Sequence, residues 1–252
     1  MIPDRAEAAF WAAYLRNRNV DAGSADDGAV AVAGGYAIYV KGSKHQVAYA
    51  VGSTRALRED DLDVLAGFYG RRSSAVRLEL RDEAYERDRE LLEAAGFVAE
   101  APRLGLYEAA LPPPDGTPGI VAHPASDRAG WIRLLVRAAA PDGAPDDALR
   151  RSVEVCAAAA HGLFVAEVDG VPAGGGAVAV TGEYAYLFCG AVLPEFRRRG
   201  VHRALIAARA AFGAERGAAR TALKIADGGA GAVQRAGFER TASLRRLRRD
   251  GA

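Results

Sequence analysis

A short basic loop in the last quarter of the chain carries the strongest chemical signal. An apolar stretch predicted as a strand ends at Leu193, Pro194 stops its pairing, and Arg197-Arg198-Arg199-Gly200 follows directly before an amphipathic helix. Free N–H groups at a helix start attract anions, glycine lets the backbone approach them, and arginine adds positive charge. These residues predict a phosphate-binding loop. The alternative is a solvated arginine run that reflects coding bias, because only three of the 33 basic residues are lysines.

The second half of the chain supplies the elements that would hold this loop. Apolar patterns predict a strand, two helices and a three-strand meander before the loop, and helix, strand, helix and strand after it. Asp169-Gly170 marks the first hairpin turn of the meander. The predicted ranges before the loop are 120–122, 127–139, 146–160, 163–168, 172–180 and 184–193, and the strands after it are 220–225 and 239–247.

The first half repeats this order, which suggests an internal duplication. Both halves close a helix with Ala-Gly-Phe, ending in Gly96-Phe97 and Gly237-Phe238, where we expect a glycine with positive φ and a phenylalanine anchored in the core. The proline-rich stretch 111–119 cannot continue a helix or a central strand. We therefore predict domains at 1–112 and 120–252, joined by a linker at 113–119. The predicted elements of the first half are a helix at 4–18 and strands at 29–32, 36–40, 46–51, 75–80 and 98–111.

The loop and its surroundings resemble the GNAT (N-acetyltransferase) superfamily. Val192 to Leu205 aligns without a gap on the family's strand-Pro-x-x-Arg-x-x-Gly-x-Gly/Ala-helix signature, except that His202 stands where glycine or alanine is usual. The element order from 120 to 247 agrees as well. The resemblance implies an α/β fold of two tandem GNAT-like domains, each a mixed, mostly antiparallel sheet flanked by helices. The first domain would be a degenerate copy.

The resemblance also implies acetyl-CoA, or a related acyl-CoA, as co-substrate. Its pyrophosphate would lie on the backbone of Arg198 to Arg203, and its pantetheine arm would pair with Ala191 and Val192. An amine would attack the thioester directly while the N–H near Val192 polarises the carbonyl. Asp227 stands roughly where the family often has an asparagine, and His202 would either contact phosphate or simply be exposed. The implied cofactor-binding residues are Ala191, Val192, Arg197, Arg198, Arg199, Gly200, Val201, His202, Arg203 and Asp227.

The family's usual acid for the leaving thiolate is missing. Many members have a tyrosine four residues before the helix-ending glycine, and this chain has Val233 there. Packing roles compete with catalytic ones, because Cys189 lies on an apolar strand and Tyr184 and Tyr186 share one face of it. The catalytic residues therefore stay unassigned. The candidate substitutes are Tyr184, Tyr186, Cys189, Glu195 and His123.

The first half lacks the loop pattern at the corresponding place. Residues 51–62 contain no Arg-x-x-Gly-x-Gly and bring Glu59, Asp60 and Asp61 near the site, where three carboxylates would repel a pyrophosphate. We expect this half to bind no acetyl-CoA and instead to support the catalytic half or wall its acceptor cleft.

Composition argues against several other classes. The chain is 50% hydrophobic and 26% charged with a formal charge of +1, which predicts a folded protein without a global field for nucleic acid or membranes. The arginine-rich end from Leu244 to Arg249 lacks interleaved aromatics, so we expect a polar strand face there. The two cysteines and four histidines show no metal-ligand spacing, which predicts no metal site. Without a signal peptide or an apolar run of spanning length, a cytoplasmic protein is expected.

The sequence thus predicts an N-acetyltransferase that moves an acetyl group from acetyl-CoA to a primary amine. The alternative is a non-catalytic acyl-CoA-binding or regulatory protein, and a third interpretation is an interaction protein that docks partners on the first half. The acceptor, a small-molecule or peptide amine, stays open among a small amine, an amino acid, an antibiotic and a protein N-terminus. The oligomeric state also stays open.

Overall fold

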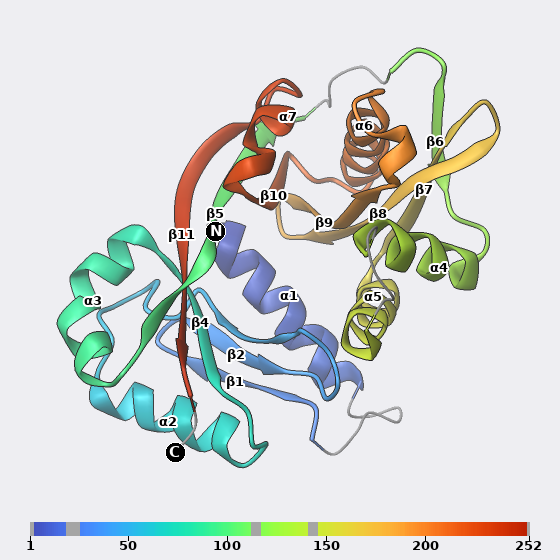
Figure 1. Ribbon diagram of the computed structural model, residues 1–252. Coiled ribbons are helices and arrows are strands. Elements are labelled where there is room, and N and C mark those ends of the chain that lie inside the picture. The colour runs from blue at the N-terminus through green and yellow to red at the C-terminus, as the bar shows by residue number, and fades with distance from the viewer. Residues whose placement is uncertain (1–2, 19–25, 112–116, 141–145, 251–252) are drawn as a thin grey trace. The chain divides into compact units, whose positions relative to one another are not determined.

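The computed structural model describes residues 3–18, 26–111, 117–140 and 146–250 (Figure 1). The chain forms two compact units. Unit 1 comprises Met1–Leu106, Ile225–Asp227 and Thr241–Ala252, and unit 2 comprises Tyr107–Lys224 and Gly228–Arg240. These bounds differ from the predicted domains at 1–112 and 120–252. Residues 113–116 of the predicted linker lie outside the described residues.

Unit 1 is a mixed sheet with strand order β1-β2-β3-β4-β11-β5. Strands β1 to β3 form an antiparallel meander, β3 runs parallel to β4, and β4 runs antiparallel to β11. Ala33 and Gly34 both have positive φ in the two-residue turn between β1 and β2, as a type I′ hairpin requires. The elements are α1 (Pro3–Arg18), β1 (Gly28–Val32), β2 (Gly35–Tyr39), β3 (Gln46–Tyr49), α2 (Glu59–Gly70), β4 (Val76–Arg81), α3 (Asp82–Ala94), β5 (Val98–Ala110) and β11 (Glu239–Arg249).

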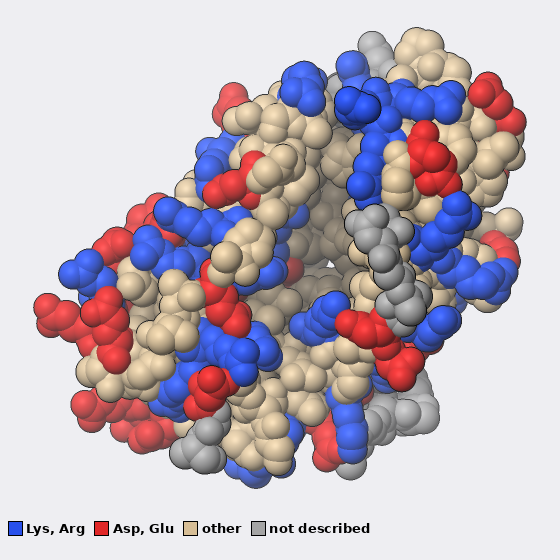
Figure 2. All heavy atoms as spheres, in the orientation of Figure 1, with Lys and Arg blue, Asp and Glu red and all other residues tan. Residues whose placement is uncertain are grey.

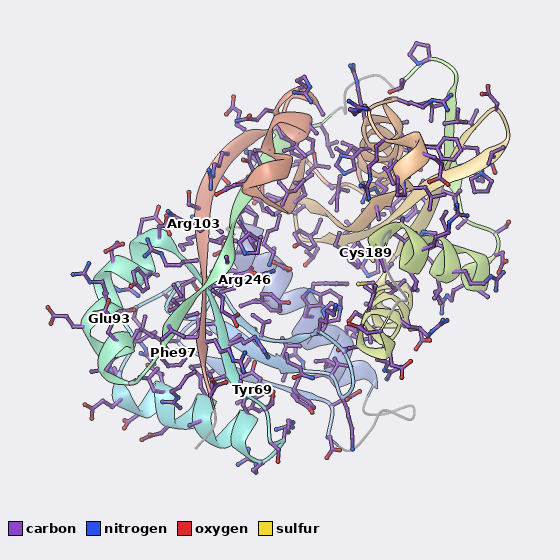
Figure 3. The ribbon with its side chains drawn as sticks, in the orientation of Figure 1. Tyr69, Glu93, Phe97, Arg103, Cys189 and Arg246 are labelled. Carbon is purple, nitrogen blue, oxygen red and sulfur yellow. The ribbon has the colours of Figure 1, made fainter. Side chains whose placement is uncertain are left out.

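The core of unit 1 lies under α2 and α3. Leu65 of α2 and Leu92 of α3 are fully buried with Leu78 of β4. The Tyr69 hydroxyl donates a hydrogen bond to the Ile38 carbonyl at 3.1 Å, so its polar end is satisfied inside the core (Figure 3).

The last strand belongs to the sheet of unit 1, although the prediction assigned it to the second domain. Strand β11 pairs antiparallel with β4, with Leu244 opposite Arg81 and Leu247 opposite Leu78. Leu244 and Leu247 are each 1% exposed. Alternation in the sequence predicts that a strand exists here, but the neighbour that buries its apolar face is set by long-range packing.

The arginines of β11 have partners within unit 1. Arg245 bonds to Asp82 and Glu86 and lies over the Tyr85 ring. Arg246, which is labelled in Figure 3, bonds to Glu79 at 3.4 Å. Their positive charge is therefore shared with neighbouring carboxylates.

Unit 2 is a mixed sheet with strand order β5-β10-β9-β8-β7-β6, in which the end of β5 takes part. Strands β6 to β9 are antiparallel, and β9 runs parallel to β10. Figure 1 shows α6 on one face of β7 to β9 and α4 and α5 on the other. The elements are β6 (Ile120–Pro124), α4 (Arg128–Ala139), α5 (Asp147–Ala159), β7 (Gly162–Val168), β8 (Val171–Thr181), β9 (Tyr184–Val192), η1 (Pro194–Phe196), α6 (Val201–Ala214), β10 (Arg220–Ala226), η2 (Asp227–Gly229) and α7 (Ala230–Gln234).

The predicted turn and helix-stop residues adopt the expected conformations. Asp169 and Gly170 both have positive φ between β7 and β8. Gly96 and Gly237 have φ of 81° and 86°, and the phenylalanine after each is buried. The Phe97 N–H donates to the Leu92 carbonyl at 3.0 Å, and the Phe238 N–H donates to the Val233 carbonyl at 3.2 Å. Both stops are confirmed as the same capping motif.

No helix in the described part of the chain is long and apolar enough to cross a membrane.

Candidate active site

The basic loop enters α6 through two residues with positive φ. Arg198 has φ of 62°, and Gly200, the residue before the helix, has φ of 92°. A Cβ at Gly200 would lie 2.6 Å from Thr117 Cγ2, and the Thr117 hydroxyl donates to the Gly200 carbonyl at 3.1 Å. Both the backbone conformation and the space require glycine here. The first N–H groups of α6 have no acceptor within the helix, so the turn presents donors to an anion.

A cavity of about 460 Å³ lies over this turn. It brings together seven of the ten predicted cofactor-binding residues with parts of η1 and α7. Ala191, Arg199 and Asp227 are not among its lining residues. The lining residues are Val192, Phe196, Arg197, Arg198, Gly200, Val201, His202, Arg203, Ala232, Arg235 and Ala236.

Positive charge gathers around the cavity. Figure 2 shows Lys and Arg side chains crowded over the loop and the start of α6. Arg197 Nε donates to the Val192 carbonyl at 3.3 Å and so ties the loop to the end of β9. Arg199 points elsewhere, since its guanidinium lies 3.8 Å from the Asp169 carboxylate and over the Phe196 ring. The cavity therefore has the charge and the N–H donors that a phosphate group requires.

His202 lines the cavity as a neutral side chain. Burial, with a smaller effect from the Arg209 charge, lowers the pKa of His202 to about 4. At neutral pH the imidazole adds no charge to the site. Its hydrogen-bonding nitrogens remain available to polar groups in the cavity.

Strand β9 carries a bulge just before the loop. Gly175 pairs with Ala191 and Ala177 pairs with Phe188, so two residues of β9, Cys189 and Gly190, stand opposite Gly176. Cys189 has φ of 49°, an uncommon conformation for a residue with a side chain. A bulge of this kind bends its strand and redirects the residues that follow. Here those residues are Ala191 and Val192.

Three consecutive glycines of β8 make room around the bulge. A Cβ at Gly174 would lie 2.6 Å from the Ala191 carbonyl oxygen, and one at Gly175 would lie 2.6 Å from Leu135 of α4. A Cβ at Gly176 would lie 2.6 Å from the guanidinium of Arg209 in α6. The glycines thus let β9, α4 and α6 all approach β8 closely.

Strands β9 and β10 are paired only over their first halves. Registered pairs run from Tyr184 opposite Arg220 to Leu187 opposite Leu223, although β9 continues to Val192 and β10 to Ala226. The main chain of β9 from the bulge onward is therefore not paired with β10.

The tyrosine candidates lie on the part of β9 before the bulge. The Tyr184 hydroxyl donates to Glu108 Oε2 at 3.3 Å, and Arg220 Nε donates to the same oxygen at 3.0 Å. Burial and then the Glu108 charge raise the pKa of Tyr184. Tyr186 is 3% exposed and its ring is stacked with Phe188. Both tyrosines take part in packing, and neither lines the cavity.

The other candidates are spread over unit 2. Glu195, in η1, accepts a hydrogen bond from Arg137 at 2.6 Å. His123 lies on the edge strand β6, where a hydrogen bond to the Pro124 carbonyl and the Glu167 carboxylate raise its pKa. Val233 is completely buried in α7 and offers no acid where the family has its tyrosine.

Cys189 lies three residues before Val192, whose N–H is expected beside the thioester. It is half-buried in the bulge, two residues before Ala191. A hydrogen bond to Cys189 and full burial raise the pKa of the Cys156 thiol in α5. The pair links the bulge to the helix beneath it.

The corresponding turn of unit 1 uses its own carboxylates. The Asp61 carboxylate accepts the Arg58 N–H at 2.9 Å, and the Asp88 carboxylate accepts the Leu57 N–H at 3.2 Å. Arg55 donates two hydrogen bonds to Asp61. The main-chain donors just before α2 are thus bonded to carboxylates of unit 1 itself.

Sequence reasoning missed several residues of the site. Arg209 is 2% exposed, yet the chain is so rich in arginine that one more on α6 gives no signal. Arg235 and Ala232 line the cavity from α7 and its end, which local patterns do not place beside the loop. The three glycines of β8 were a usable signal, because adjacent glycines inside a strand indicate close approach by other elements.

The comparisons with known proteins agree on the fold. Residues 120–238 match the family model described as the acetyltransferase (GNAT) family. A GCN5-related N-acetyltransferase from Kribbella flavida has a TM-score of 0.68 at 17% identity, with 100% of this chain and 97% of that chain covered. A tandem GNAT protein from the clavulanic acid biosynthesis pathway has a TM-score of 0.58 at 15% identity, with 99% and 96% covered.

A GCN5-related N-acetyltransferase from Sphaerobacter thermophilus has a TM-score of 0.54 at 18% identity, with 82% and 73% covered. At such identities the likeness shows the fold alone. It confirms the predicted α/β class with two tandem GNAT-like domains. A comparison with curated proteins found no match.

Proposed function

We propose that unit 2 transfers an acetyl group from acetyl-CoA to a primary amine, on the premise that residues 120–238 match the model of the acetyltransferase (GNAT) family. Acetyl-CoA supplies the thioester that the amine attacks directly. The acceptor is a small-molecule or peptide amine.

One observation carries the choice of donor. The cavity over the start of α6 combines a turn of positive-φ residues, the first N–H groups of a helix, and arginine side chains on its wall. Phosphate groups need this combination, and an uncharged ligand does not. Arg197, Arg198, Arg203 and Arg235 are the lining arginines.

The end of β9 supports a role in orienting the thioester. Beyond the bulge the strand is unpaired on the β10 side, so its main chain can bond to a pantetheine arm. Fixed N–H groups beside a reacting carbonyl stabilise the charge that develops on its oxygen. The N–H near Val192 is the donor that we assign to this role.

The site offers no dedicated tyrosine acid. Val233 is buried and apolar, so the leaving thiolate departs without a proton from that position.

Calorimetric titration of acetyl-CoA tests the proposal. We expect saturable binding to the intact protein and none to Gly200→Glu, whose carboxylate would stand among the anion donors. A second variant, Arg235→Glu, reverses one charge on the cavity wall at an exposed position. It should weaken binding about tenfold.

The matched control is Gly42→Glu in the β2–β3 turn of unit 1. Gly42 also has positive φ, 70°, and open space around it, so the control carries the same strain and charge away from the cavity. It should bind as the intact protein does. If the intact protein binds no acetyl-CoA, the proposal is wrong. If the intact protein does bind acetyl-CoA, the release of free thiol on addition of different amines identifies the class of acceptor.

The buried Val233 favours one alternative, a protein that binds acyl-CoA without transferring the acyl group. The two functions separate on thiol release. An acyl-CoA sensor would bind in the calorimeter and release no thiol with any amine tested.

A further inference from the structure

Arg209 is the one charged side chain among the fully buried large residues of the described chain. It reaches from α6 into the sheet and is 2% exposed. Its hydrogen bonds go to main-chain carbonyls, from Nε to Leu205 at 2.9 Å and from Nη1 to Ala177 at 3.2 Å and to Phe188 at 3.3 Å. Within the described residues no carboxylate forms an ion pair with it. A buried cation without a counter-charge is costly, so its retention calls for a specific role.

The acceptors of Arg209 lie at the bulge of β9. Ala177 and Phe188 form the first regular pair of β8 and β9 beyond the two extra residues, Cys189 and Gly190. A bulge interrupts the ladder and leaves carbonyl groups in need of donors. One guanidinium nitrogen, Nη1, donates to a carbonyl of each strand beside this interruption and so joins the two strands there.

The surrounding sequence leaves space for this guanidinium on both strands. A Cβ at Gly176 would lie 2.6 Å from Nη1, and one at Gly190 would lie 3.5 Å from Nη2. A Cβ at Gly190 would also lie 3.7 Å from Nε2 of His202, a residue of the cavity wall. Arg209 therefore fills the layer between the bulge and the cavity.

We infer that Arg209 is a positioning residue for acetyl transfer, which holds the bulge of β9 so that the main chain of Ala191 and Val192 is presented to the thioester. This inference rests on the proposed function. Arg209 contacts the carbonyls of the strand and not the reacting atoms, so its effect passes through the backbone.

The chemistry of arginine suits this role better than that of lysine. Burial lowers the pKa of Arg209 to about 10, so the side chain stays protonated and keeps its donors at neutral pH. Its planar group reaches three carbonyls from one rigid frame, whereas a lysine has a single nitrogen. Methionine would fill part of the space but leave the carbonyls of Ala177 and Phe188 without this donor.

The test compares Arg209→Met and Arg209→Lys with Arg216→Met. Arg216 is an exposed arginine just after α6 that lies over the Phe212 ring and bonds to the Phe212 carbonyl. Hydrogen exchange of the peptide 186–193 reports the bulge without any need for activity. We expect faster exchange there in Arg209→Met, an intermediate rate in Arg209→Lys, and no change in Arg216→Met.

Binding and turnover give the second readout. Adenosine 3′,5′-bisphosphate probes the phosphate-binding turn alone, and its affinity should stay within about twofold in Arg209→Met. Turnover of acetyl-CoA, followed by thiol release, should fall about 100-fold in kcat with a smaller change in KM, because a displacement of about 1 Å costs that much. Arg209→Lys should recover part of kcat.

The outcomes separate the two proposals. Unchanged exchange at 186–193 in a folded Arg209→Met protein would overturn the inference, as would an unchanged kcat. If Arg209→Met does not fold, Arg209→Lys decides by the same two readouts. A third outcome combines faster exchange in Arg209→Met with no acetyl-CoA binding by the unmutated protein. It would support the role of Arg209 in holding the bulge and would refute the proposed function.

Discussion

The Asp61 carboxylate accepts a hydrogen bond from the main-chain N–H of Arg58 at 2.9 Å and so caps the start of α2. Arg55 also binds this carboxylate, and its hydrogen bonds are the main reason that the pKa of Asp61 is lowered. Replacing Asp61 by alanine removes both the acceptor and the charge and should destabilise unit 1 by about 1 kcal/mol at pH 7. Because the folded-state pKa is lowered, the loss should be constant above pH 4 and shrink as the pH falls further.

The two tryptophans of the chain allow this to be measured. Trp11 lies in unit 1 and Trp131 in unit 2, so a Trp131→Phe background reports urea unfolding of unit 1 by fluorescence. Asp60→Ala is the control, since Asp60 is exposed in the same first turn, and it should cost only about 0.3 kcal/mol. Equal losses in both variants would contradict the capping role of Asp61.

Local sequence signals predict the elements of this fold better than they predict its long-range contacts. The Asp169-Gly170 turn and the Gly96 and Gly237 helix stops follow from the few conformations that such residues favour, and all are found as predicted. Strand β11 was predicted as a strand but assigned to the wrong sheet, because its partner β4 is more than 150 residues away. Partner choice depends on packing that no local pattern records.

The site shows the same division. Arg197, Arg198 and Gly200 of the basic loop line one cavity, as expected from a continuous motif, whereas Arg199 does not. Arg209 and the bulge were not predicted, since they depend on how α6 crosses β8 and β9. Val233 is buried at the position where many family members have the tyrosine acid, so the structure offers no acid at the position where the sequence lacks one.

The low pKa of His202 predicts a pH dependence for the stability of unit 2. Its folded-state pKa of about 4 lies below the ordinary value of 6.5, so the unfolded chain binds a proton that the folded one excludes. The contribution of the neutral His202 to the free energy of unfolding of unit 2 is complete above pH 6.5 and is lost as the pH falls toward 4. Between pH 7 and pH 5 unit 2 should lose about 2 kcal/mol through this residue.

Urea unfolding in a Trp11→Phe background, followed by Trp131 fluorescence, measures this loss. His202→Gln should remove most of the pH dependence between pH 5 and pH 7. His161→Gln, at the residue just before β7, is the control, and it should leave the pH dependence of unit 2 unchanged. A His202→Gln protein as sensitive to pH as the parent would refute the buried neutral imidazole.

The position of β11 between β4 and β5 predicts where a core mutation acts. Leu247 is 1% exposed and packs in the core of unit 1, so Leu247→Ala should cost about 2–5 kcal/mol in the Trp11-reported transition. The Trp131-reported transition of unit 2 should not move. Arg248→Ala, on the half-buried neighbour, should cost less than about 1 kcal/mol. A loss confined to the Trp131 transition would place the strand in the predicted 120–252 domain after all.

The spacing at Gly176 tests how tightly Arg209 is packed against the bulge. A Cβ there would lie 2.6 Å from Nη1 and 2.7 Å from Cζ of Arg209, and that guanidinium is held by three carbonyls and cannot move aside cheaply. Gly176→Ala should therefore destabilise unit 2 by about 1–3 kcal/mol, measured by urea unfolding with Trp131 as reporter. Gly228→Ala is the control, because no atom lies within 4 Å of a Cβ at that position. If Gly176→Ala were as stable as the parent, Arg209 would have to be free to leave the bulge, and its role as a rigid support would fail with it.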